Sequence, residues 1–104
     1  MGKTYIGDIG TVLRTTLLSV TGSAVDLSTA TDAIYYVIKP DLTVTEWACT
    51  IDTPSTAGVI SYTTIEDDWD QVGFYKYQPK ITFEDADVFH GNTQYVKVYN
   101  LGEV

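Results

Sequence analysis

The fold class of this chain is decided by one stretch, Asp70-Gln71-Val72-Gly73-Phe74-Tyr75-Lys76-Tyr77-Gln78-Pro79-Lys80-Ile81-Thr82-Phe83. From Tyr75 onward every second residue is apolar and the residues between them are polar, whereas Phe74 is an apolar exception. A period of two is typical of a β-strand that has one face in the core and the other in water. The polar residues before Gly73 predict a tight turn that leads into this strand.

The start of this strand resembles the tyrosine corner of immunoglobulin-like sandwiches. In those domains a tyrosine two residues before the second disulfide cysteine bonds back to the backbone upstream. Tyr75 occupies the place of that tyrosine, and Tyr77 stands where the cysteine would be. We therefore expect a β-sandwich without its disulfide.

The composition indicates one folded domain over residues 1–104. The hydrophobic share is 44% and eight residues are tyrosine, which is a composition typical of globular proteins. Six basic residues stand against fourteen acidic ones, for a net charge of −8. Such a field repels nucleic acids and anionic membrane surfaces, so neither is expected as a partner.

The single cysteine, Cys49, cannot form an internal disulfide, which excludes a disulfide-stabilised secreted module. The first eight residues lack the apolar core of a signal peptide, and no run approaches the roughly 18 apolar residues of a membrane span. We expect a protein that is made in the cytoplasm and stays soluble.

About seven strand-like runs are separated by turn signals. They cover residues 11–20, 33–39, 44–51, 58–64, 73–83, 88–90 and 94–101. A short extended piece is expected at 24–27 and a single helical turn at 65–70. Short strands with turns every 8–12 residues favour a sandwich or barrel, and no segment has the helical period of a crossover helix. The sequence thus predicts an all-β, immunoglobulin-like sandwich of about seven antiparallel strands.

Catalytic chemistry has few candidate residues. His90 is the sole histidine and would have to serve in any Cys–His or Ser–His pair. Cys49 lies in the middle of a predicted strand, on the same face as Trp47 and Ile51, where a thiol is normally inert. We expect no enzyme and no cofactor.

One acidic cluster is a candidate cation site, because hard cations such as calcium take carboxylate oxygens as ligands. Its members are Glu66, Asp67, Asp68 and Asp70. Their spacing matches no EF-hand loop, and a charged turn at the edge of a sandwich explains them as well. The sequence leaves open whether they bind a cation.

The last predicted strand is apolar on both faces, since Tyr95 and Tyr99 share one face while Val96 and Val98 share the other. Exposed aromatic side chains often anchor interfaces or stack on sugars, although tyrosines on an outer face also pair simply across strands. The candidate interface residues are Tyr5, Ile6, Tyr95, Val96, Val98 and Tyr99. Trp69, beside the acidic cluster, is the candidate residue for glycan contact.

The order of several short motifs resembles a known family. The motifs are Gly7-Asp8-x-Gly10, Val25-Asp26-Leu27-Ser28, Lys39-Pro40-Asp41, Gly58-Val59-Ile60-Ser61-Tyr62 and Gly73-Phe74-Tyr75. They resemble the immunoglobulin-like domain at the start of tailed-phage baseplate upper proteins, from about Tyr5 to Leu101. The family usually has Asp-Gly in the first hairpin, where Leu42 follows Asp41 in this chain. It often has Asp-Gly in the later hairpin too, where this chain has residues 84–87.

This resemblance implies a non-enzymatic structural component of a tailed bacteriophage virion, in the tail, baseplate, neck or head. Such a component acts through protein–protein contacts with other virion proteins, in many copies, and is located in the virion. The alternative is a carbohydrate-binding adhesion module that contacts the host surface through Trp69.

Overall fold

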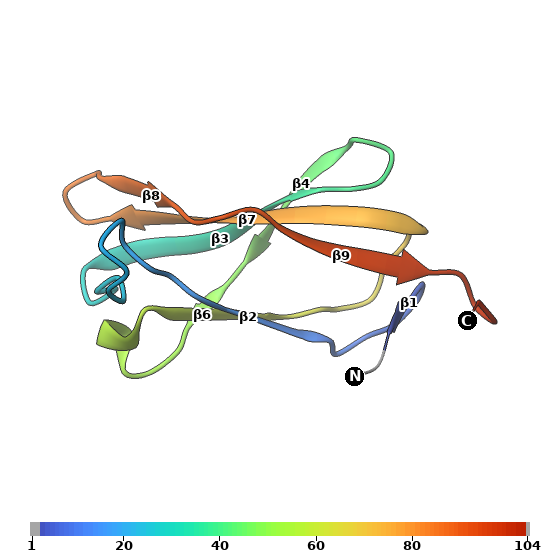
Figure 1. Ribbon diagram of the computed structural model, residues 1–104, viewed down its shortest axis with the longest axis horizontal. Coiled ribbons are helices and arrows are strands. Elements are labelled where there is room, and N and C mark those ends of the chain that lie inside the picture. Colours follow the sequence, from blue (N-terminus) through green and yellow to red (C-terminus); the bar gives the residue numbers. More distant parts are fainter. Residues whose placement is uncertain (1–2, 104) are drawn as a thin grey trace.

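The chain forms two β-sheets that pack face to face (Figure 1), and the computed structural model describes residues 3–103. The larger sheet has the strand order β1-β9-β7-β3-β4, with β8 pairing β7, and the smaller sheet has the order β2-β6-β5. The strands are β1 (Thr4–Tyr5), β2 (Val12–Thr16), β3 (Ala30–Ile38), β4 (Val44–Ala48), β5 (Thr50–Ile51), β6 (Val59–Thr63), β7 (Gly73–Phe83), β8 (Val88–His90) and β9 (Gln94–Tyr99). One 3₁₀ turn, η1, covers Ser55–Ala57. No helix among the described residues could cross a membrane.

The predicted alternation along residues 73–83 is confirmed. This stretch is β7, the central strand of the larger sheet, which pairs with β3 on one side and with β9 and β8 on the other. Tyr75, Tyr77 and Ile81 are buried between the sheets, while Phe74 and Lys76 are exposed. The buried positions therefore alternate with exposed or half-buried ones from Phe74 to Ile81.

The tyrosine corner is present as expected. The Tyr75 hydroxyl accepts hydrogen bonds from the backbone N–H groups of Asp70 (3.1 Å) and Gln71 (3.0 Å), and it donates one to Asp70 Oδ1 (3.1 Å). Burial raises the pKa of Tyr75 to about 12, so the hydroxyl keeps its proton at neutral pH. These bonds fix the turn that leads into β7.

Tyr77 takes the place of the missing disulfide cysteine and packs edge to face with Tyr35, at 4.9 Å between ring centroids. The Tyr35 hydroxyl in turn makes a buried 2.7 Å hydrogen bond with Thr15 of β2, which lies in the other sheet. An aromatic pair and a hydrogen bond thus connect the two sheets in the centre of the core. Cys49 is a free cysteine.

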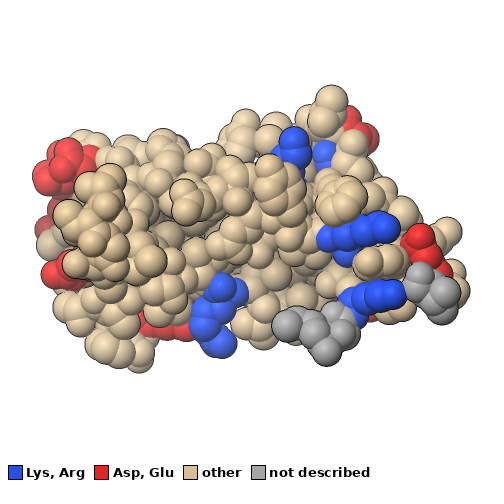
Figure 2. Space-filling view, in the orientation of Figure 1, with Lys and Arg blue, Asp and Glu red and all other residues tan. Residues whose placement is uncertain are grey.

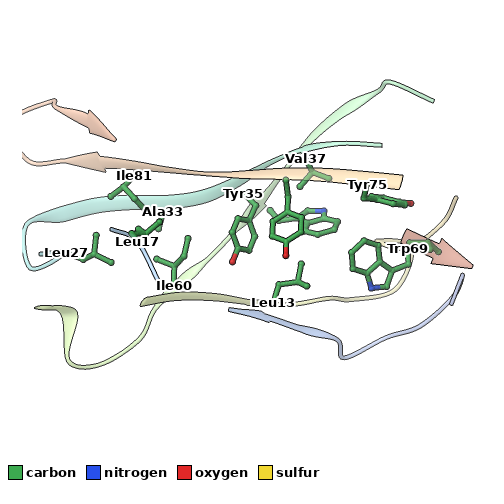
Figure 3. Packing of buried hydrophobic residues seen from close by; sticks show 13 residues of the cluster. Leu13, Leu17, Leu27, Ala33, Tyr35, Val37, Ile60, Trp69, Tyr75 and Ile81 are labelled. Carbon is green, nitrogen blue, oxygen red and sulfur yellow. The ribbon is translucent and has the colours of Figure 1, made fainter. Parts of the chain in front are cut away.

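The core is aliphatic at one end and aromatic at the other, as Figure 3 shows from Leu27 to Trp69. At the aromatic end Trp69 packs edge to face against Tyr75 (4.9 Å) and Trp47 (5.3 Å), and Trp47 stacks on Tyr62 (4.9 Å). Edge-to-face pairs at these distances stabilise a core beyond the area they bury.

The all-β, immunoglobulin-like sandwich without a disulfide is confirmed, with four differences in detail. Residues 3–103 form nine strands instead of about seven, and β1 runs parallel to β9. The expected strand over 44–51 is divided at Cys49, where the chain leaves the larger sheet as β4 and enters the smaller one as β5. Residues 65–70 form turns and no helix.

Candidate functional site

The outer face of the larger sheet carries lysines and aromatic side chains side by side. Phe74 and Lys76 point outward from β7 because their neighbours Tyr75 and Tyr77 point into the core. The strand register places Lys97 opposite Phe74 and Tyr95 opposite Lys76, so these residues form cross-strand pairs on one face. We call this surface the lysine–aromatic face; it consists of Phe74, Lys76, Tyr95, Lys97 and Tyr99.

Cation–π contacts join Lys97 to two aromatic rings of the lysine–aromatic face. The Lys97 ammonium lies 4.6 Å from the centre of the Tyr99 ring and 6.0 Å from that of Phe74. The ammonium of Lys3 lies 4.9 Å from the centre of the Tyr99 ring. The centre of the Tyr5 ring lies 5.9 Å from the centre of the Tyr99 ring. Exposed contacts of this kind are each worth about 0.5–1 kcal/mol. The side chains are therefore partly ordered before any partner arrives.

Large apolar groups remain open to solvent here, since Phe74 is 58% and Tyr95 62% exposed. The lysines of this face are also opposite in sign to the net charge of the whole molecule, which is −8. Figure 2 shows several basic side chains over the half that contains β9 and acidic ones at the opposite end, near the β7–β8 turn; further acidic side chains lie at the edge of the β9 half, and a basic one lies near the middle. The strand register places the carboxylates of Asp32 and Glu46 on this side of the sheet as well, but on the more distant strands β3 and β4.

Three of the six predicted interface residues lie together at this surface. Tyr5, Tyr95 and Tyr99 lie on β1 and β9, and none of them is buried. The prediction is wrong for Val98, which is fully buried, because the pleat of β9 turns it into the core. Ile6 and Val96 are partly buried and also pack against the core.

Sequence reasoning missed Phe74, Lys76 and Lys97 as members of this surface. A signal was available in Phe74, the apolar exception among the polar positions of β7. A single exposed apolar residue is common on any protein surface, so Phe74 gains meaning only together with the exposed Tyr95 on the neighbouring strand. The pairing of Phe74 with Lys97 depends on the register of β7 with β9, which the sequence does not reveal.

Trp69 is not a glycan-binding residue, and that prediction is corrected. Its side chain is 1% exposed, enclosed by Tyr75 and Trp47. Its indole nitrogen is also buried and has no hydrogen-bond partner among the described residues. The acidic neighbours of Trp69 suggested a surface position, but the aromatic end of the core needs its large ring.

The acidic cluster at 66–70 is a set of turn contacts. Asp68 accepts hydrogen bonds from the Tyr62 hydroxyl (2.6 Å) and the backbone N–H of Ile65 (2.8 Å). Asp70 accepts one from Lys39 at 3.0 Å, and this bond lowers the pKa of the Asp70 carboxyl. Residues 3–103 contain no group of three His, Cys, Asp or Glu side chains that could hold a metal ion. The carboxylates therefore serve different protein partners instead of converging.

Cys49 and His90 do not form a catalytic pair. The Cys49 thiol packs against the core and lies 3.6 Å from the Trp47 carbonyl oxygen. Burial raises its pKa to about 12, so it is almost entirely protonated at neutral pH. His90 is exposed on β8, opposite Lys80 on the outer side of the larger sheet. The two side chains thus lie on opposite faces of that sheet.

No family model and no protein of curated function matches this chain. Among solved structures, the crystal structure of CopC from Methylosinus trichosporium OB3b is similar, with a TM-score of 0.54 and 8% sequence identity. The similarity covers 100% of this chain and 90% of that chain. At so low an identity the likeness shows the fold alone.

The functional prediction of a structural component of a tailed phage virion is corrected, because the solved structure found to be similar is CopC and no virion protein is among the matches. The adhesion alternative loses its contact residue, because Trp69 is buried. The resemblance to the baseplate family is tested by none of these matches and stays a prediction.

Proposed function

We propose that this domain is a non-enzymatic protein-binding module, and that its lysine–aromatic face docks against an acidic, partly apolar surface of a partner. One observation carries the proposal: Lys76 and Lys97 lie among three aromatic rings on an outer sheet face of a strongly acidic chain. An acidic protein that concentrates cations on one face attracts carboxylates there and repels them elsewhere.

The aromatic groups supply the contact area. Tyrosine and phenylalanine are enriched at the centres of protein interfaces, because rigid rings bury much apolar surface at little cost in conformational entropy. Phe74 and Tyr95 are more than half exposed and lie on neighbouring strands, so a partner that covers one also covers the other. The lysine stems add apolar area around them.

A small-molecule site is less well supported on this side of the sheet. The hollow there has a volume of about 250 Å³ and is lined by Tyr36, Glu46, Gln78, Lys80 and His90. Ligand sites for organic molecules span roughly 300–1,000 Å³ and enclose most of the ligand. A nearly flat sheet face suits the surface of another protein better.

A metal site, such as one for copper, is not proposed for this chain. The copper ligands available to proteins are chiefly histidine, cysteine and methionine. The described residues supply only Cys49 and His90 of these, on opposite faces of a sheet, and no metal-binding group forms among them.

The test uses a fluorescein-labelled nine-residue peptide of alternating glutamate and leucine, with a lysine–leucine peptide of the same length as its counterpart. Fluorescence anisotropy is measured at 50 mM NaCl. We expect the glutamate peptide to bind in spite of the net negative charge, and the lysine peptide to bind more weakly. Affinity for the glutamate peptide falls at 500 mM NaCl, because surface charges are screened there.

The decisive variant is Lys76→Gln with Lys97→Gln, which should weaken binding of the glutamate peptide by about tenfold, at about 0.7 kcal/mol for each lost charge. Its matched control is Thr16→Glu with Thr50→Glu, two exposed positions on the smaller sheet. Both variants have a net charge of −10, but the control leaves the lysine–aromatic face intact. Equal weakening in both variants overturns the proposal, as does stronger binding of the lysine peptide.

A further inference from the structure

An acidic hollow lies at the end of the molecule that carries the β7–β8 turn. It has a volume of about 430 Å³ and is lined by Thr29, Phe83, Asp85, Asp87, Val88 and Phe89. Its apolar part includes Val88, which is 48% exposed, and two phenylalanine rings. Two carboxylates line it, and Glu84 adds a third exposed carboxylate in the same turn.

The carboxylates of the acidic hollow make no ion pair with the described residues, although Asp85 Oδ1 accepts a hydrogen bond from the Asp87 N–H (3.0 Å). The two ion pairs found among residues 3–103 join Arg14 to Asp52 and Lys39 to Asp70, so they involve none of these groups. The turn itself is well defined, since the Phe83 N–H donates to the Asp87 carbonyl oxygen at 2.9 Å.

The acidic hollow and the lysine–aromatic face lie at opposite ends of the same strand. Phe74 is at the start of β7 and Phe83 at its end, nine residues apart. At about 3.3 Å per residue this separates them by roughly 30 Å, in a molecule whose longest dimension is 46 Å. Figure 2 shows acidic side chains at the end that carries the β7–β8 turn, and several basic side chains, with a few acidic ones, over the other half.

We propose that the acidic hollow of a second copy of this chain docks on the lysine–aromatic face, so that copies associate head to tail. This inference rests on the proposed function and names the partner. The chemistry is complementary in both respects: Lys76 and Lys97 meet carboxylates, and the rings of Phe74 and Tyr95 meet an apolar hollow. A contact between two different surfaces of one chain leaves one of each surface free in a dimer, so further copies can add to form a row or a closed ring.

The charges also exclude the symmetric arrangements. Two lysine–aromatic faces packed together would bring Lys76 and Lys97 against the same lysines, and two acidic hollows would oppose carboxylates. Like charges across an interface cost several kcal/mol. The patches are small, so we expect weak association, with a dissociation constant on the order of 100 μM.

The experiment is sedimentation velocity from 10 μM to 1 mM protein, at 50 and 500 mM NaCl. The unaltered chain should form species larger than dimers at the highest concentration and low salt, and should be monomeric at high salt. A chain that is monomeric at 1 mM in 50 mM NaCl overturns the head-to-tail arrangement. In that case binding of the glutamate peptide still decides the proposed function separately.

Two variants show which surfaces meet. Lys76→Glu with Lys97→Glu disables the lysine–aromatic face, and Glu84→Lys with Asp87→Lys disables the acidic end. Each variant alone should be monomeric, but an equimolar mixture should form a 1:1 complex and nothing larger, because each retains the surface that the other lacks. This complex also shows that both variants are folded.

Two results overturn the arrangement. If the variant at Glu84 and Asp87 still self-associates, the lysine–aromatic faces meet each other. If both variants have native circular dichroism and their mixture stays monomeric while the unaltered chain associates, the contact lies elsewhere. The Thr16→Glu, Thr50→Glu control should associate like the unaltered chain.

Discussion

Replacing Tyr75 by phenylalanine removes one oxygen atom from the tyrosine corner and leaves its ring in the core. Three hydrogen bonds of 3.0–3.1 Å are lost, two from backbone N–H groups and one to a carboxylate. At about 0.5–1.5 kcal/mol for each bond, we expect the free energy of unfolding to fall by about 2–4 kcal/mol. For a domain of this size that corresponds to a decrease in Tm of roughly 10–20 °C.

Urea unfolding followed by circular dichroism and by tryptophan fluorescence measures the loss. The fluorescence is sensitive to this site because Trp69 packs against Tyr75. Tyr95→Phe is the matched control, since that tyrosine is 62% exposed and its hydroxyl makes no hydrogen bond with the described residues; it should change stability by less than about 0.5 kcal/mol. If the two variants are equally stable, the hydroxyl of Tyr75 does not hold the corner and the reasoning fails.

Four further predictions concern single residues. Leu42 is 75% exposed in a left-handed conformation (φ 72°), so Leu42→Gly should raise the free energy of unfolding by about 0.5–1 kcal/mol in urea; a lower stability would contradict this. Gly58→Ala should cost about 2 kcal/mol or more in the same assay, because φ is 71° and the added Cβ would lie 2.8 Å from a backbone oxygen. The buried thiol of Cys49, with its pKa of about 12, should react with Ellman's reagent at pH 8 about 10³-fold more slowly in the native state than in urea. The hydrogen bond from Lys39 lowers the pKa of the Asp70 carboxyl in the folded state. The ionised carboxylate therefore stabilises the fold above about pH 4, and this stabilisation is lost as the pH falls through the folded pKa. The Asp70→Asn variant should lose less stability between pH 5 and pH 2 than the unaltered chain.

The features that the sequence predicts well are local ones. The alternation along β7 requires only that side chains two apart share a face, and this holds whatever the rest of the chain does. The tyrosine corner joins Tyr75 to residues four and five positions earlier, so its geometry is contained in a short segment.

The features that escaped prediction depend on partners far away in the sequence. Trp69 has four carboxylates around it in sequence, and its burial becomes possible only because Tyr62 and Lys39 satisfy two of them in space. The parallel pairing of β1 with β9 joins residues more than ninety positions apart, and no local pattern indicates it. The lysine–aromatic face depends on the register between β7 and β9. These two strands are separated in the sequence by β8, which also pairs with β7, so no local pattern gives their register.

The pairing of β1 with β9 also governs how the chain can fold during synthesis. Thr4 leaves the ribosome more than ninety residues before its partner Val98. Until β9 emerges, both β1 and the adjoining edge of β7 lack their backbone partners, and such open edges invite pairing with other chains. The larger sheet is therefore completed only after β9 has been synthesised, and non-local pairings of this kind fold on the millisecond-to-second scale. Throughout that period the open edges of the nascent chain are exposed to aggregation.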